Sequence, residues 1–125
     1  MTNRLSARIA VGVARLAILL PPPQLLRFVE LVSRGARPAD PAIAAEARDV
    51  VCAVSRRCAG QGCLQRSVAV VLLCRARGVA PDWCTGFLTR PFTAHAWVEA
   101  DGRPVGEKEQ VSEYVVVQAH RVPAR

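Results

Sequence analysis

Cys63 is the residue whose position most clearly suggests chemistry. It follows a flexible break, Ala59-Gly60-Gln61-Gly62, and begins a segment of helical periodicity that stops at Gly78. The first turn of a helix carries N–H groups without intrahelical partners and a partial positive charge. Both stabilise a thiolate, the reactive form of cysteine, and the same N–H groups can hold an oxyanion. We therefore expect Cys63 to be a nucleophile.

His95 supplies a candidate base on a predicted strand over residues 93–100. The stretch Glu99-Ala100-Asp101-Gly102-Arg103 suits a three-residue hairpin loop, a type I turn followed by a left-handed glycine. That loop pairs His95 with Glu107 on one face of the sheet. A two-residue Asp-Gly turn would shift the register by one and turn Glu107 to the other face. The first register predicts a nucleophile, a base and an orienting carboxylate.

The elements that must position these residues change in type along the chain. Prolines 21–23, Gly35, the Asp40-Pro41 pair and Gly78 delimit four helices. Helices are predicted over residues 4–20, 24–33, 41–58 and 63–77, with apolar residues at helical spacing in the first (Leu5, Ile9, Val13, Leu16 and Leu20). Strands are predicted over residues 81–88, 93–100, 103–107 and 114–118. Helices followed by a small antiparallel sheet indicate an α+β fold. We expect residues 1–125 to form a single domain, with a helical region over 1–60 and a catalytic core over 61–125.

Composition narrows the function classes. The net charge is +7, but all except one of the 17 basic residues are Arg, and no basic cluster is interleaved with aromatics. Nucleic-acid binding is therefore not expected. The five cysteines form no C-x-x-C pair, and no His lies near enough to complete a zinc site, so we expect no metal and no other cofactor. Free thiols favour a reducing cytoplasm.

The N-terminal apolar run over residues 9–20 raises the question of membrane targeting. Arg15 interrupts the run, which is too short to span a bilayer, and no small-residue cleavage site is evident. We expect neither a signal peptide nor a transmembrane helix. An amphipathic helix that docks on a partner protein or on a membrane surface is the alternative use of this segment.

Two motifs together resemble a known family. They are Cys63-Leu64-Gln65-Arg66-Ser67 and, after a strand through Gly86, the stretch from Ala94-His95-Ala96-Trp97-Val98-Glu99 to Asp101-Gly102-Arg103. This pattern resembles the lasso peptide biosynthesis B2 protein, the leader peptidase of lasso peptide clusters, which has a transglutaminase-like fold. The close resemblance covers roughly residues 60–110. The family's triad of Cys, His and Asp implies Cys63 and His95, with the third member near Glu107, where the family usually has Asp. Asp101 is the other acid nearby, although its place beside Gly102 is typical of a turn.

The resemblance implies a cysteine protease that removes the leader of a ribosomally made precursor peptide. A separate leader-binding protein, called B1 or the RiPP recognition element, and an ATP-using lasso cyclase are the implied partners. The oxyanion donors would be the Cys63 N–H and the side chain of Gln61 or Gln65. Arg66 is expected on the exposed or substrate side of the helix, and Trp97 either in the core or as a substrate platform.

Two other functions are compatible with these residues. A transglutaminase or another amide-forming acyl transferase would use the same triad with an amine as acceptor instead of water. A non-catalytic adaptor would bind a peptide or partner through its basic helical half. The reactivity of Cys63 separates these classes, because an adaptor's buried thiol would not alkylate quickly near neutral pH.

Overall fold

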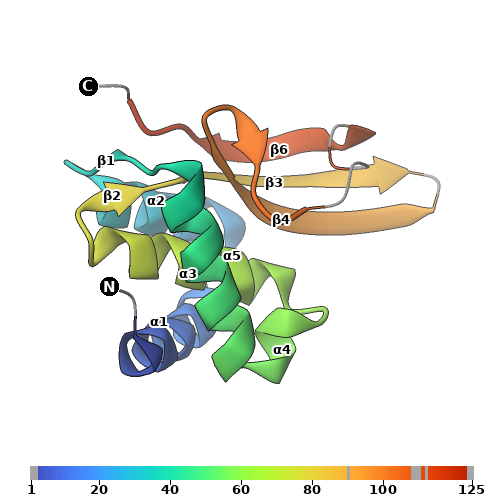
Figure 1. Cartoon of the computed structure of the whole chain (residues 1–125). Coiled ribbons are helices and arrows are strands. Elements are labelled where there is room, and N and C mark those ends of the chain that lie inside the picture. Colours follow the sequence, from blue (N-terminus) through green and yellow to red (C-terminus); the bar gives the residue numbers. More distant parts are fainter. Residues whose placement is uncertain (1–2, 90, 108–110, 112, 124–125) are drawn as a thin grey trace.

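The computed structural model, which describes residues 3–89, 91–107, 111 and 113–123, consists of a layer of helices beneath a small sheet (Figure 1). The helices are α1 (Arg4–Ala17), α2 (Pro22–Ser33), α3 (Pro41–Val54), α4 (Arg56–Ala59) and α5 (Cys63–Arg75). The strands are β1 (Arg37–Pro38), β2 (Val79–Ala80), β3 (Asp82–Thr89), β4 (Phe92–Ala100), β5 (Arg103–Pro104) and β6 (Val115–His120). This arrangement confirms the predicted α+β fold. The parallel pair β1–β2 was not predicted.

Capping side chains explain where α1, α3 and α4 begin. The side chain of Asp40 accepts a hydrogen bond from Ala42 N–H at 2.8 Å and starts α3, as the Asp-Pro signal predicts. The predicted helix over 41–58 is wrong in one respect, because it breaks at Ser55. Ser55 has extended backbone angles, and its hydroxyl accepts a hydrogen bond from Cys58 N–H at 3.2 Å, which starts the separate helix α4. The break reorients the chain just before the Cys63 loop.

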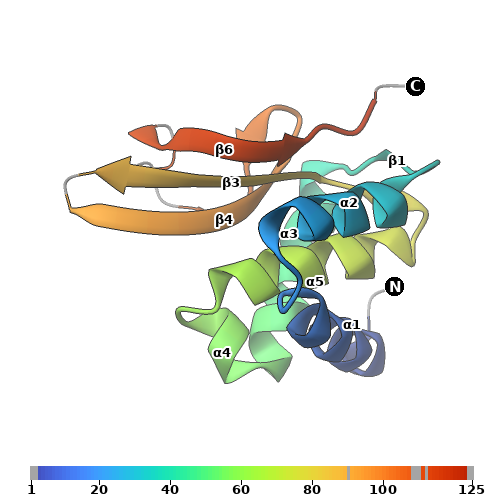
Figure 2. The ribbon, with the colours of Figure 1, turned by 180° about the vertical axis from the view of Figure 1, so that it is seen from behind.

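Helix α5 lies at the centre of the helical layer. It contacts α1, α2 and α3 as well as strands of the sheet, and Figure 2 shows it between α1 and the strands. Almost every position from Gln65 to Cys74 is buried, which is typical of a helix covered on all sides. One hydrophobic cluster joins this helix to α1, α3 and the sheet residues Trp83 and Val98. The first turn of α5 is thereby held firmly against the sheet.

The sheet has the order β5-β4-β3-β6, with antiparallel neighbours. The hairpin between β4 and β5 turns through two residues, because Asp101 and Gly102 both have positive φ, 54° and 74°, and Ala100 pairs with Arg103. This is the geometry of a type I′ turn. The predicted three-residue loop is therefore wrong, as is a strand over 103–107. After Val105, whose N–H donates to Val98 at 3.0 Å, the chain leaves β4 and exposes part of its edge.

Candidate active site

The loop before Cys63 is held by close backbone packing. A Cβ on Gly62 would lie 2.7 Å from the Arg57 carbonyl oxygen, so only glycine fits without a shift. The buried guanidinium of Arg66 donates to the carbonyls of Cys58, at 2.7 Å, and Gly60, at 3.1 Å. These bonds tie α4 and the loop to the first turn of α5. The position of Cys63 at the start of α5 is therefore fixed by the packing at Gly62 before it and by the Arg66 hydrogen bonds after it.

Cys63 is half-buried and faces β4 where that strand has no β5 neighbour. Burial raises the pKa of the Cys63 thiol. Hydrogen bonds from His95 and from the Ala96 backbone N–H, together with the positive charges of His95 and Arg66, outweigh burial and leave the pKa below its ordinary value. The thiolate is therefore favoured by groups from β4 as well as by its place on α5.

His95 lies between the thiol and a carboxylate. Its Nε2 is 2.5 Å from Glu107 Oε1, and its ring stacks on Trp97 and contacts Tyr114, with ring centroids 5.9 and 5.8 Å apart. The hydrogen bond to Cys63 and then the one to Glu107 raise the pKa of His95 to about 9, against the opposing effect of burial. The imidazole is therefore protonated at neutral pH, and its positive charge favours the thiolate form of Cys63.

Glu107 reaches His95 by a route that strand pairing does not provide. With the two-residue turn, β5 ends at Pro104 and the predicted pairing of His95 with Glu107 does not form. The chain bends at Gly106, which has a φ of 68°, and brings the Glu107 side chain back against His95. Arg48 packs against Gly106 and its guanidinium is 3.9 Å from Glu107 Oε2. Asp101, the other acid considered, lies exposed in the hairpin turn.

The expected oxyanion and substrate residues are arranged differently. The Cys63 N–H donates to the Gln61 carbonyl at 2.9 Å, and Gln61 is exposed in the loop before the thiol. Gln65 is buried and donates its amide to the Val11 carbonyl on α1 at 3.0 Å, so it faces away from Cys63. Arg66 is only 7% exposed, which corrects the expectation of an exposed position. Trp97 is a core residue whose indole donates to Glu99 at 2.8 Å.

An apolar groove of about 570 Å³ opens at Cys63 and His95. Its walls come from the α1–α2 connection, the first turn of α2, the start of α5 and the strands β3, β4 and β6, and its lining contains no Asp, Glu, Lys or Arg. The residues are Ile18, Leu20, Pro22, Leu25, Cys63, Leu64, Thr85, Gly86, Phe87, Phe92, Ala94, His95, Ala96, Val117 and Gln118. Sequence reasoning missed the contribution of the α1–α2 connection. It also missed the Ala96 N–H, which no side-chain pattern can reveal.

Among the residues that the structure describes, no group of three or more His, Cys, Asp or Glu is arranged to hold a metal ion. No helix in the same part of the chain is long and apolar enough to cross a membrane. All five cysteines are free thiols. Their odd number alone required that at least one be free.

A helix-terminal thiol against an imidazole on an antiparallel sheet is an arrangement of cysteine-dependent acyl-transfer enzymes. The chain belongs to the Transglutaminase-like superfamily, because a model of that family matches residues 7–119. This match extends from α1 to β6 and so includes the N-terminal helices, well beyond the two motifs. No curated protein and no solved structure matches the chain.

Proposed function

We propose that the chain is a cysteine peptidase of the lasso peptide B2 kind, which removes the leader from a ribosomally made precursor before macrolactam formation. The observation that carries the proposal is the line of contacts from Cys63 through His95 to Glu107, beside an apolar groove whose lining contains no Asp, Glu, Lys or Arg. The motif around His95 points to this family within the larger superfamily. Glu107 then stands where the family usually has Asp, and its longer side chain still reaches the imidazole.

The proposed reaction is acyl transfer to water. The Cys63 thiolate attacks the scissile carbonyl, and His95 protonates the amine as the C–N bond breaks, which leaves the leader as a thioester on Cys63. Neutral His95 then takes a proton from water as the water attacks the thioester, the C–S bond breaks to restore the Cys63 thiolate beside protonated His95, and the released leader acid loses its proton to solvent. Glu107 orients His95 and stabilises its charged form. The Leu64 N–H in the first turn of α5 and the side chain of Gln61 are the proposed oxyanion donors, since the Cys63 N–H already donates to the Gln61 carbonyl.

The proposed partners follow from this reaction. The substrate is the precursor peptide, a separate leader-binding B1 protein presents it, and the lasso cyclase uses the freed amine. The proposed compartment is the cytoplasm, where five reduced thiols are stable. No cofactor is required by the steps above.

The test combines the chain with the precursor peptide and the leader-binding protein, and reads the products by mass spectrometry. Wild-type chain should release leader and core as two hydrolysis products. Cys63→Ala should lower the rate by several orders of magnitude, whereas Cys52→Ala and Cys84→Ala should retain measurable activity. Cleavage by Cys63→Ala at the wild-type rate would refute the proposal. A product in which an added amine replaces water would instead assign the chain to acyl transferases.

A further inference from the structure

Helix α1 exposes its large apolar residues and packs its small ones inward. Leu5, Ile9, Leu16 and Leu19 in and after this helix are 69%, 60%, 70% and 78% exposed. The side that packs on α3 and α5 consists of alanines: Ala7, Ala10, Ala14 and Ala17. Scattered exposed apolar residues are ordinary, but a contiguous row of them marks an interaction site. We call this the α1 row: Leu5, Ile9, Val13, Leu16 and Leu19.

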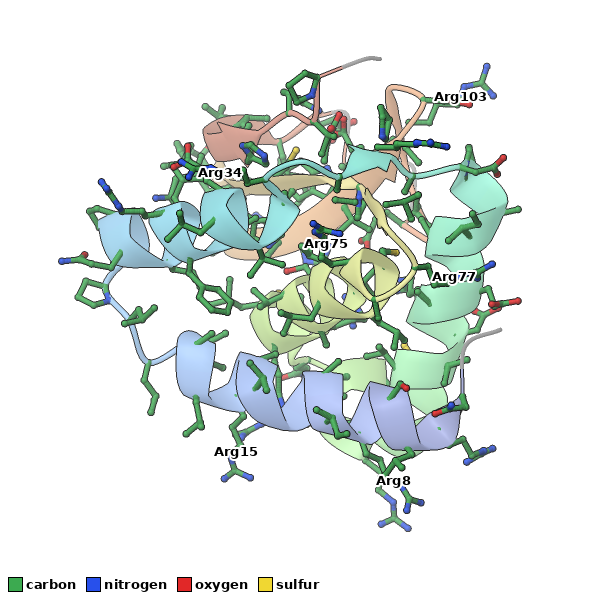
Figure 3. The ribbon with its side chains drawn as sticks, turned by 90° about the vertical axis from the view of Figure 1, so that its left-hand side faces the viewer. Arg8, Arg15, Arg34, Arg75, Arg77 and Arg103 are labelled. Atoms are coloured by element: carbon green, nitrogen blue, oxygen red, sulfur yellow. The ribbon has the colours of Figure 1, made fainter. Side chains whose placement is uncertain are left out.

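An uncompensated positive border runs beside the α1 row. At about 100° per residue, the part of the row within α1 lies roughly 120° around the helix from the buried alanines, and Arg4, Arg8 and Arg15 lie roughly 120° further. None of these arginines forms an ion pair with the residues that the structure describes. Figure 3 shows Arg8 and Arg15 pointing away from the rest of the molecule. The helix itself contains no acid.

The α1 row leads to the candidate active site. Ile18 and Leu20, which follow α1 directly, line the groove that also holds Cys63 and His95. A polypeptide bound along the row can therefore continue into the groove. This continuity favours a polypeptide over a membrane, because an extended chain can enter the groove whereas a bilayer surface cannot.

We propose that the α1 row binds a partner polypeptide whose own apolar strip is bordered by carboxylates, and that this partner delivers the substrate to Cys63. Apolar burial supplies the affinity, and the arginine border steers association and fixes orientation. Binding beside the groove raises the local concentration of the scissile bond at the thiolate. The delivery step rests on the proposed peptidase function, whereas the docking surface does not.

The test measures binding and cleavage separately, with the leader-binding protein as the probe. Ile9→Asn with Leu16→Asn removes part of the row, and Arg8→Glu with Arg15→Glu reverses the border. Leu31→Asn on α2, where the side chain is 53% exposed, and Arg103→Glu are matched controls; Figure 3 places Arg103 across the molecule from α1. Circular dichroism and the rate of Cys63 alkylation verify that each variant is folded.

Both α1 variants should bind the leader-binding protein roughly tenfold or more weakly by titration calorimetry, and the controls should bind as wild type. kcat/KM should fall in parallel for precursor presented by that protein, but stay unchanged for a short peptide that spans only the scissile bond. Undiminished binding of the α1 variants, or no binding by the wild-type chain, would overturn the docking surface. Row-dependent binding to anionic lipid vesicles in place of the protein would also overturn it. Row-dependent protein binding without any cleavage would support the surface and reject the peptidase.

Discussion

The chemistry at residue scale depends on which proton-binding groups surround Cys63 and His95. Glu107 stabilises the imidazolium, and the imidazolium stabilises the thiolate, so each charge supports the next. The raised pKa of His95 contributes stability that is complete below its ordinary value of 6.5 and is lost as pH rises through about 9. The lowered pKa of Cys63 contributes stability above its ordinary value of 9.0 that is lost as pH falls through the lowered value. The ion pair is therefore most populated between the lowered pKa of Cys63 and the raised pKa of His95.

Iodoacetamide alkylation should report this ion pair directly. Wild-type Cys63 should react quickly near pH 7, and His95→Ala should slow the reaction by about tenfold for each unit by which the thiol pKa rises. Peptide cleavage should fall above about pH 9, because His95 then lacks the proton that the leaving amine needs. Cys74, whose pKa burial raises to about 12, serves as the internal unreactive thiol. Equal alkylation of both cysteines at pH 7 would contradict the ion pair.

The identity of the orienting acid can be tested by comparing two carboxylates. Glu107→Ala should lower kcat clearly but less than His95→Ala does, since an orienting group contributes less than the base that it orients. Asp101→Ala should leave kcat close to wild type, because Asp101 lies in the hairpin turn. Steady-state kinetics on one peptide substrate measure both. An inactive Asp101 variant beside an active Glu107 variant would exclude the assignment.

At the scale of elements, the site depends on how α4, the glycine loop and α5 meet. Two features hold that junction: the absence of a side chain at Gly62 and the bonds from Arg66 to the loop carbonyls. Both concern the backbone that carries Cys63, so a small shift there moves the thiol relative to β4. The sheet also positions the site. Because β5 pairs only with Glu99 and Ala100 of β4, the Ala96 N–H is left to donate to the Cys63 sulfur.

Gly62→Ala should reduce activity more than it reduces stability. Its new Cβ would lie 2.7 Å from the Arg57 carbonyl oxygen, so the loop must shift, at a cost of about 1–3 kcal/mol typical of overpacking. Gly12→Ala is the matched control, because a Cβ there meets nothing within 4 Å. In a helix interior that change should stabilise the chain by about 0.5–1 kcal/mol. Thermal unfolding and cleavage rates measure both effects, and an unaltered rate in Gly62→Ala would show that the junction tolerates the shift.

At the scale of the whole molecule, the helical layer has two surfaces of different character. Its inner surface covers the sheet and buries α5. Its outer surface leaves an apolar row on α1 that ends beside the groove.

Cleavage of precursor by this chain alone should be slow or absent, and should rise when the leader-binding protein is added. The reason is that tethering the leader near the groove raises the effective concentration of the scissile bond. Initial rates at equal enzyme concentration, with and without the partner, measure the effect. Full activity without any partner would exclude this dependence. A serum albumin control shows whether added protein acts non-specifically.

Several features followed from the sequence because they depend on local signals. The loop glycines and the helical period placed Cys63 at a helix start, and β-branched and aromatic residues placed His95 on a strand. Asp40 and Pro41 fixed the start of α3. The order of helices before strands was enough to predict the α+β class. Such signals act within a few residues, so they depend little on contacts with distant parts of the chain.

Other features were decided only by tertiary structure. Ala100-Asp101-Gly102-Arg103 suits either turn length, and the two-residue turn formed, so Glu107 reaches His95 through the bend at Gly106 and not through strand pairing. Arg66 is buried because nearby loop carbonyls need its donors. Helix α1 turns alanines inward because close approach to α5 favours small side chains over leucines. In each case the sequence permits two local outcomes, and contacts between distant segments select one.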